Sequence, residues 1–143
     1  MKPCLADANV LFPLLLSEHE HHELVLRWFD HLSPGQVILC RVVHLGLIRL
    51  LGNPAILGRR ALSASAAWTM IEDLMEDERM DFASEPASLN TFLPKLFKYS
   101  VPTNKLVGDA YLAAFSIAAQ LRLATLDQGF QHFKEVDLEL LSP

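Results

Sequence analysis

The sequence lacks the features of a membrane or secreted protein. It holds two cysteines, Cys4 and Cys40, among 143 residues, and it has no run of about eighteen apolar residues that could cross a bilayer. The first acid, Asp7, comes too early for a secretory signal peptide. Both cysteines lie in apolar runs, where they suit small core residues in a reducing compartment better than a disulfide or a metal pair. We therefore expect a cytoplasmic protein with no membrane segment.

Basic charge and glycine are also scarce where some phosphate-binding proteins need them. The net charge of −5 argues against a protein that coats nucleic acid through bulk electrostatics. No glycine-rich phosphate loop follows the first expected strand, which disfavours a phosphohydrolase of small phosphoesters. What is present is a chain of 51% hydrophobic and 20% charged residues without repeats or low-complexity segments. Residues 1–143 are therefore expected to form one globular domain.

Short apolar runs alternate with amphipathic segments along the chain. Strands are expected at residues 3–7, 37–40, 80–83, 123–126 and 137–141. Helices are expected at residues 10–16, 17–32, 41–51, 63–77, 87–99 and 107–121. This alternation predicts an α/β fold in which a central, mostly parallel sheet lies between two layers of helices. Functional sites of such folds lie beyond the carboxyl ends of the strands.

Three acids are expected at that edge of the sheet. Asp7 and Asp127 each end a predicted strand, and Asp109 opens the helix that leads into the strand at 123–126. Each acid alone could be an ordinary cap or turn residue. Together they form a set of carboxylate oxygens that suits Mg²⁺ or Mn²⁺. Such an ion polarises a phosphoryl oxygen and lowers the pKa of a bound water, so the predicted reaction is hydrolysis of a nucleic-acid backbone.

Neighbouring polar residues are candidates to support these acids. Asn9 can fix the turn at Asp7 or donate to a phosphate. Thr125 can hydrogen-bond a carboxylate or a metal-bound water, and Asn104 can cap the loop before Asp109. The candidates for phosphate contacts are Arg41, Arg49, Lys95, Lys98 and Lys105. The histidines at 19, 21 and 22 could suggest a metal site, but we interpret them as a solvated helix start, since adjacent positions do not share a helix face.

The motifs around these acids resemble one known family. They are Asp7-x-Asn9, Gly108-Asp109-Ala110-Tyr111-Leu112-Ala113-Ala114 and Ala124-Thr125-Leu126-Asp127, with a further similar stretch at residues 45–54. In this order and spacing they resemble the PIN-domain nucleases, especially the VapC toxins of toxin–antitoxin pairs. The resemblance implies a PIN fold and a Mg²⁺- or Mn²⁺-dependent endoribonuclease with the three aspartates as metal ligands. It also implies a homodimer and a cognate antitoxin that blocks the site.

The sequence departs from the family pattern at one place. The family commonly has an acid, usually Glu, ahead of the arginine that matches Arg49, whereas residues 41–49 contain no acid. Either His44 or Gly46 occupies that position. His44 could reach a metal, a phosphate or the water, or it could simply pack at a helix edge. The missing acid motivates an alternative function, a PIN-like module that has lost efficient cleavage and retains RNA or protein binding.

Overall fold

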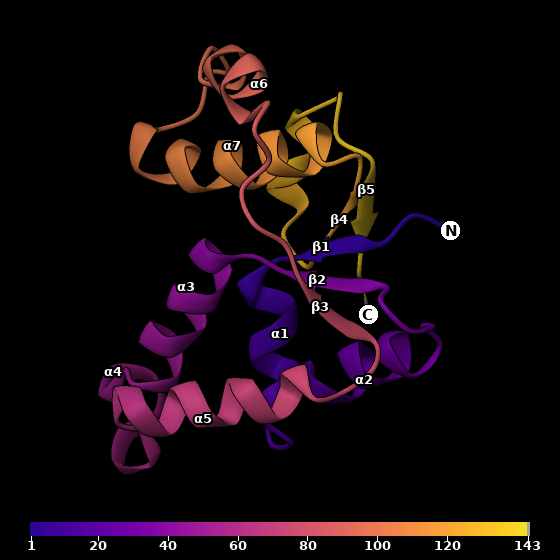
Figure 1. Cartoon of the computed structure of the whole chain (residues 1–143). Helices are drawn as coiled ribbons and strands as arrows, with labels where there is room; N and C mark the ends of the chain where they lie inside the picture. The colour runs from indigo at the N-terminus through magenta and orange to yellow at the C-terminus, as the bar shows by residue number, and fades with distance from the viewer. Residues whose placement is uncertain (143) are drawn as a thin grey trace.

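Five strands form a single parallel sheet at the centre of the molecule. The computed structural model describes residues 1–142 (Figure 1). The strands are β1 (Cys4–Ala6), β2 (Val37–Leu39), β3 (Met80–Phe82), β4 (Arg122–Thr125) and β5 (Leu138–Leu140). They lie in the order β3-β2-β1-β4-β5, and each neighbouring pair is parallel. The expected α/β fold is confirmed, with a sheet that is parallel throughout.

Helices cover both faces of the sheet. They are α1 (Ala8–Leu15), α2 (His22–Asp30), α3 (Arg41–Leu51), α4 (Pro54–Leu57), α5 (Ala64–Met75), α6 (Leu89–Leu96) and α7 (Thr103–Ala118), with short 3₁₀ turns η1 (Gly58–Arg60) and η2 (Gln128–His132). From β1 the chain moves outward to β2 and β3, and then it crosses back to β4. Because parallel crossovers are right-handed, this reversal puts α6 and α7 on the face opposite α1 to α5, as Figure 1 shows.

The reversal of direction lies between β1 and β4. These strands pair along their full length, with Leu5 beside Leu123 and Ala6 beside Ala124. In open α/β sheets, the crevice beyond the carboxyl ends of two such strands is the usual place for a site. Asp7 directly follows β1. Asp127 follows β4 after one intervening residue, Leu126. The topology therefore brings two of the expected acids to this crevice.

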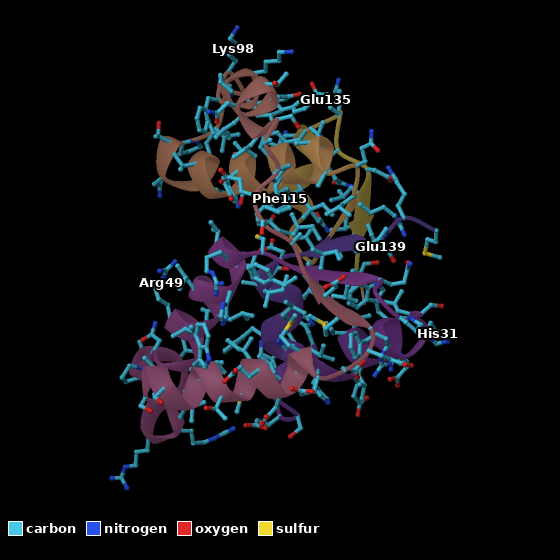
Figure 2. All side chains as sticks on the ribbon, in the orientation of Figure 1. His31, Arg49, Lys98, Phe115, Glu135 and Glu139 are labelled. Carbon is cyan, nitrogen blue, oxygen red and sulfur yellow. The ribbon has the colours of Figure 1, made fainter. Side chains whose placement is uncertain are left out.

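The core is made by the strands and by the helix faces that pack on them. Leu5 and Leu123 are fully buried, and Phe115 of α7 points toward the sheet (Figure 2). Cys4 and Cys40 are buried free thiols, which confirms their interpretation as core residues. Within residues 1–142, no helix is long and apolar enough to cross a membrane.

Helix α7 begins earlier than the sequence pattern suggested. It starts at Thr103, directly after Pro102, instead of at residue 107. Gly108 is a poor helix former, so the pattern gives little sign that the helix continues through it. The backbone N–H of Lys105 already bonds to the carbonyl of Pro102. Asp109 therefore lies in the second turn, and the expectation that it opens the helix is wrong.

The connection between α1 and α2 is longer than expected. Helix α2 begins at His22, so residues 17–21 form a loop instead of a helix start. The hydroxyl of Ser17 bonds to Glu18 and caps nothing, and the backbone N–H of His19 closes a tight turn onto Leu16. This loop, which we call the histidine loop (residues 17–21), bears on the site described next.

Candidate active site

Asp7 joins the end of β1 to the start of α1. Its Oδ1 accepts a hydrogen bond from the backbone N–H of Ala8 (2.7 Å), so the side chain caps the helix. Its Oδ2 accepts a bond from the hydroxyl of Thr125 (2.9 Å). Burial raises the pKa of Asp7, and the nearby charges of Asp109 and Asp127 raise it further, although the two hydrogen bonds oppose the shift. Asp7 is therefore a carboxylate whose charge is poorly compensated by this chain.

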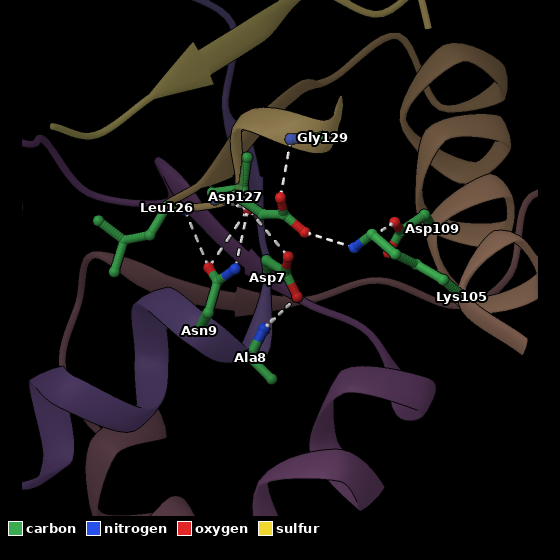
Figure 3. Close-up of polar contacts among 9 residues, drawn as sticks. Asp7, Ala8, Asn9, Lys105, Asp109, Leu126, Asp127 and Gly129 are labelled. Carbon is green, nitrogen blue, oxygen red and sulfur yellow. Dashed lines mark hydrogen bonds and ion pairs between the residues drawn. The ribbon is translucent and has the colours of Figure 1, made fainter. Parts of the chain in front are cut away.

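Thr125 and Asn9 hold this carboxylate in place. Figure 3 shows Asn9 beside Asp7. The fully buried hydroxyl of Thr125 donates to Asp7 and accepts from the amide of Asn9 (3.1 Å) and from the backbone N–H of Asp127 (3.0 Å). The Oδ1 of Asn9 accepts from the backbone N–H of Leu126 (3.0 Å). The first turn of α1 is thus tied to the end of β4. The expectation that Thr125 bonds a carboxylate is confirmed.

Asp127 and Asp109 share one ammonium group. The Nζ of Lys105 lies 2.8 Å from Oδ2 of Asp127 and 3.1 Å from Oδ2 of Asp109. The other oxygen of Asp127 caps η2 by accepting from the backbone N–H of Gly129 (2.7 Å). The hydrogen bond from Lys105 lowers the pKa of Asp127, despite an opposing effect of burial. Figure 3 shows Lys105 reaching from α7 toward both acids.

The three acids line one cavity. Asp7, Asp109 and Asp127 come from distant parts of the chain and border the same hollow of about 590 Å³. Part of the opposite wall is the histidine loop, through His19, Glu20 and His21. This position could not be predicted, because residues 17–23 are all polar and are equally suited to the start of the helix that follows. The expectation of a merely solvated helix start misses that these side chains face the acids' cavity.

The donor set matches a hard divalent cation. Carboxylate oxygens are the ligands that Mg²⁺ and Mn²⁺ prefer, and a buried Asp7 with a raised pKa would be stabilised by a bound cation. As the side chains lie, no group of three His, Cys, Asp or Glu residues within 1–142 is arranged to hold a metal. Lys105 draws two of the acids to itself. The residues therefore fit an ion chemically, since Lys105 contacts one oxygen of each of these two acids and Asp7 pairs with no cation within residues 1–142.

Two sequence candidates lie outside this cavity. His44 faces a different hollow of about 200 Å³, where its Nδ1 accepts from the Arg41 guanidinium (2.7 Å) and its ring lies 4.6 Å from that of Trp68. Burial lowers the pKa of His44, and Arg41 lowers it further. Asn104 is an exposed residue inside α7, whose N-cap position is Pro102, so it does not cap the loop before Asp109. Of the two alternatives for His44, the structure shows packing beside Arg41 and Trp68, away from the acids. The expectation that Asn104 caps the loop before Asp109 is wrong.

Gly46 lies on the same face of α3 as Leu50. It precedes Leu50 by one helical turn, and Leu50 lines the acids' cavity. A Cβ on Gly46 would meet nothing within 4 Å, so a side chain there has room. Of the two positions that could hold the missing acid, the structure therefore selects Gly46 over His44.

Most of the candidate phosphate contacts also lie away from the acids. Arg49 is exposed on α3 (Figure 2), and Arg41 packs beside His44. Among the ion pairs formed within residues 1–142, Lys105 is the basic residue that contacts Asp109 and Asp127.

The sequence and the fold of this chain are similar to those of known proteins. The family model for the PIN domain matches residues 4–136. The chain belongs to the PIN-domain family. A PIN-domain relative, ribonuclease VapC41 from Mycobacterium tuberculosis strain H37Rv, is 33% identical, and the alignment covers 96% of this chain and 98% of that protein. The resemblance to PIN domains and to VapC proteins is thereby confirmed.

Solved structures show the same PIN fold. VapBC-1 from nontypeable Haemophilus influenzae superposes with a TM-score of 0.67 and 15% identity, covering 97% of this chain and 98% of that one. A toxin–antitoxin complex from Klebsiella pneumoniae gives a TM-score of 0.61 and 15% identity, covering 93% and 94%. At such identities these likenesses establish the fold alone.

Proposed function

We propose that this PIN-domain chain is a metal-dependent endoribonuclease, the toxin of a toxin–antitoxin pair. The observation that carries the proposal is the meeting of Asp7, Asp109 and Asp127 in one cavity, at the point where the strand order reverses. The relative at 33% identity is named a ribonuclease, which supports RNA as the substrate. A structural neighbour was solved as a toxin–antitoxin complex, which supports an antitoxin partner.

The residues of the site have two proposed roles. Some would bind the metal ion, and others hold its ligands in position. Asp7, Asp109 and Asp127 would hold Mg²⁺ or Mn²⁺, which when bound supplies Lewis-acid activation of a phosphoryl oxygen and of water. Thr125 and Asn9 fix the Asp7 carboxylate, so that it is oriented before RNA arrives. We further propose that the chain forms a homodimer in the cytoplasm.

Cleavage of a mixed cellular RNA pool tests the activity. Purified wild type, Asp109→Asn and Asp73→Asn are compared with Mg²⁺, with Mn²⁺ and with EDTA. Asp73 is exposed on α5, away from the cavity, so its variant controls for the loss of one negative charge. We expect metal-dependent fragments from wild type and Asp73→Asn, and none from Asp109→Asn. Equal cleavage by Asp109→Asn, or in EDTA, would contradict the proposal.

Growth provides a test in cells. Expression of the wild-type chain should slow growth, and Asp7→Asn should relieve the effect, because Asp7 belongs to the proposed ion site. A reading frame for a small antitoxin should adjoin the gene, and its co-expression should restore growth. Growth arrest that persists with Asp7→Asn would show that toxicity does not come from this site.

One observation favours the second candidate, a binding module without efficient cleavage. Helix α3 presents no acid, and Lys105 already neutralises part of the charge on Asp109 and Asp127. For that function, folded protein free of antitoxin should retain RNA without cutting it, and retention should be the same in EDTA. Cleavage in the first experiment excludes this candidate.

A further inference from the structure

Lys105 is placed by the fold itself. It lies one helical turn before Asp109 on α7, so the spacing i, i+4 puts both side chains on one face. Asp127 approaches from the end of β4, and Gly129 allows this approach, since a Cβ there would lie 3.0 Å from Oδ1 of Asp127 and 3.6 Å from Cε of Lys105. The ammonium therefore bridges α7 and the end of β4. The helical spacing, the approach of Asp127 and the absence of a side chain at Gly129 together bring it there.

Asp109 forms a wall between two cavities. On one side is the hollow that it shares with Asp7 and Asp127. On the other side is a hollow of about 270 Å³, which Asp109 shares with Lys105 and His132. Lys105 lines the second hollow and not the first, so the hollow that Asp7 borders is left for another cation.

The charges at the site fit one divalent ion. The three aspartates and the ammonium, counted without Glu20 of the histidine loop, leave two negative charges, which a single Mg²⁺ or Mn²⁺ balances. A second divalent ion would have to displace Lys105 from carboxylate oxygens that lie 2.8 and 3.1 Å from its nitrogen. The excess negative charge is concentrated at Asp7, for which the chain supplies no cationic partner within residues 1–142.

We propose that Lys105 takes the place of a second metal ion, so that this site binds one divalent cation, on the Asp7 side of Asp109. The inference rests on the ion site of the proposed function and specifies its stoichiometry. In this arrangement Lys105 is a positioning residue: it holds Asp109 and Asp127 and leaves Asp7 to the ion.

The test counts Mn²⁺ ions bound by the metal-free protein, by calorimetric titration and by electron paramagnetic resonance of free Mn²⁺. Wild type should bind one ion per chain. Lys105→Met keeps the length of the stem and removes the charge, so it should bind a second ion, and the first about tenfold more tightly. Lys105→Arg restores a cation and should return the count to one.

A matched control removes a lysine elsewhere. Lys98 follows α6 and points outward (Figure 2), and it borders neither cavity, so Lys98→Met should behave as wild type. Two ions bound by wild type, or an unchanged count and affinity in Lys105→Met, would overturn the inference.

The outcome is separable from the activity. One ion in wild type and two in Lys105→Met supports the role of Lys105 whether or not RNA is cut. RNA cleavage accompanied by two ions in wild type supports the proposed function and overturns this inference. Absence of Mn²⁺ binding to every variant at millimolar concentration overturns both.

Discussion

Asp7 and Asp127 occupy equivalent places in the fold and have opposite environments. Each follows one of two adjacent parallel strands, and each caps the helical turn that comes next. Yet the pKa of Asp7 is raised, mainly by burial, whereas the pKa of Asp127 is lowered, mainly by Lys105. Neutral donors surround the first acid, and an ammonium pairs with the second. Of these two carboxylates, Asp7 is therefore the one that lacks a cationic partner from the chain itself.

The largest effect is expected from Asp7→Asn, which removes the carboxylate that lacks a cationic partner. RNA cleavage should fall by more than about 100-fold, because the loss of partners that only orient a metal ligand already costs about 10–100-fold. The amide oxygen of Asn can still cap Ala8, so the fold should survive. Single-turnover cleavage at saturating Mn²⁺ measures the loss, and activity within tenfold of wild type would contradict an ion-holding role for Asp7.

The same variant has a pH signature. A carboxyl with a raised pKa favours the folded state below its ordinary pKa and loses that contribution as pH rises through the folded-state pKa. At neutral pH the ionised Asp7 is therefore a cost to the metal-free protein, and Asp7→Asn should unfold at a higher temperature than wild type. The difference should shrink as the pH falls and Asp7 takes up a proton. Thermal melts in EDTA from pH 4 to 7 check both statements.

The next largest effect concerns what holds Asp7. Thr125→Val keeps the shape of the side chain and removes a buried hydroxyl that bonds to Asp7, Asn9 and the backbone of Asp127. Buried partners left unsatisfied cost about 1–3 kcal/mol in the free energy of unfolding, and cleavage should fall about 10–100-fold. Urea denaturation measures the first effect. Thr69→Val, at an exposed position of α5, is the control and should change stability little.

A third change adds charge on the side of Asp7. Gly46→Glu places an acid on the face of α3 that Leu50 shows to border the cavity, so Mn²⁺ should bind about tenfold more tightly. Replacing a helical glycine should also stabilise the fold by about 0.5–1 kcal/mol. His44→Glu is the matched control, because His44 faces Arg41 and Trp68 instead. A larger gain in Mn²⁺ affinity from His44→Glu than from Gly46→Glu would reverse the assignment.

The smallest effect is expected from Asp127→Asn on stability. A lowered pKa contributes stability above the ordinary pKa of the carboxyl and loses it as pH falls through the folded-state pKa. The pair with Lys105 is partly exposed, so its loss should cost only about 0.2–1 kcal/mol at pH 7 and less at high salt. Urea denaturation at low and high salt, at pH 7 and at pH 4, measures the difference. A cost that is the same at every pH would place the stabilisation elsewhere.

The sequence was sufficient for the sheet and for the three acids. The central strands β1, β2 and β4 could be predicted because they contain short apolar runs that are buried, as Leu5 and Leu123 illustrate, whereas the edge strands β3 and β5 each include an acid and are less buried. Asp7 and Asp127 follow such runs directly, so their place at one edge needs only the rule that parallel strands share a direction. The order of the strands could not be predicted, because local patterns do not specify which strands pair.

Details that depend on helix boundaries and on helix faces were missed. With α7 expected to begin at residue 107, Lys105 lay in a loop, and its i, i+4 relation to Asp109 was invisible. His44 and Gly46 are both plausible by alignment of motifs, and only the packing of α3 separates a face toward Trp68 from a face toward the acids. The ends of helices and the direction of side chains come from tertiary packing, which competes with local propensity.

The pairing of β1 with β4 also determines the stage of synthesis and folding at which the site can form. Asp7 is made well before Thr125 and Asp127. Until β4 has docked beside β1, the carboxylate of Asp7 has neither its hydroxyl partner nor the other acids near it. A nascent or truncated chain that ends before residue 122 therefore lacks the assembled site.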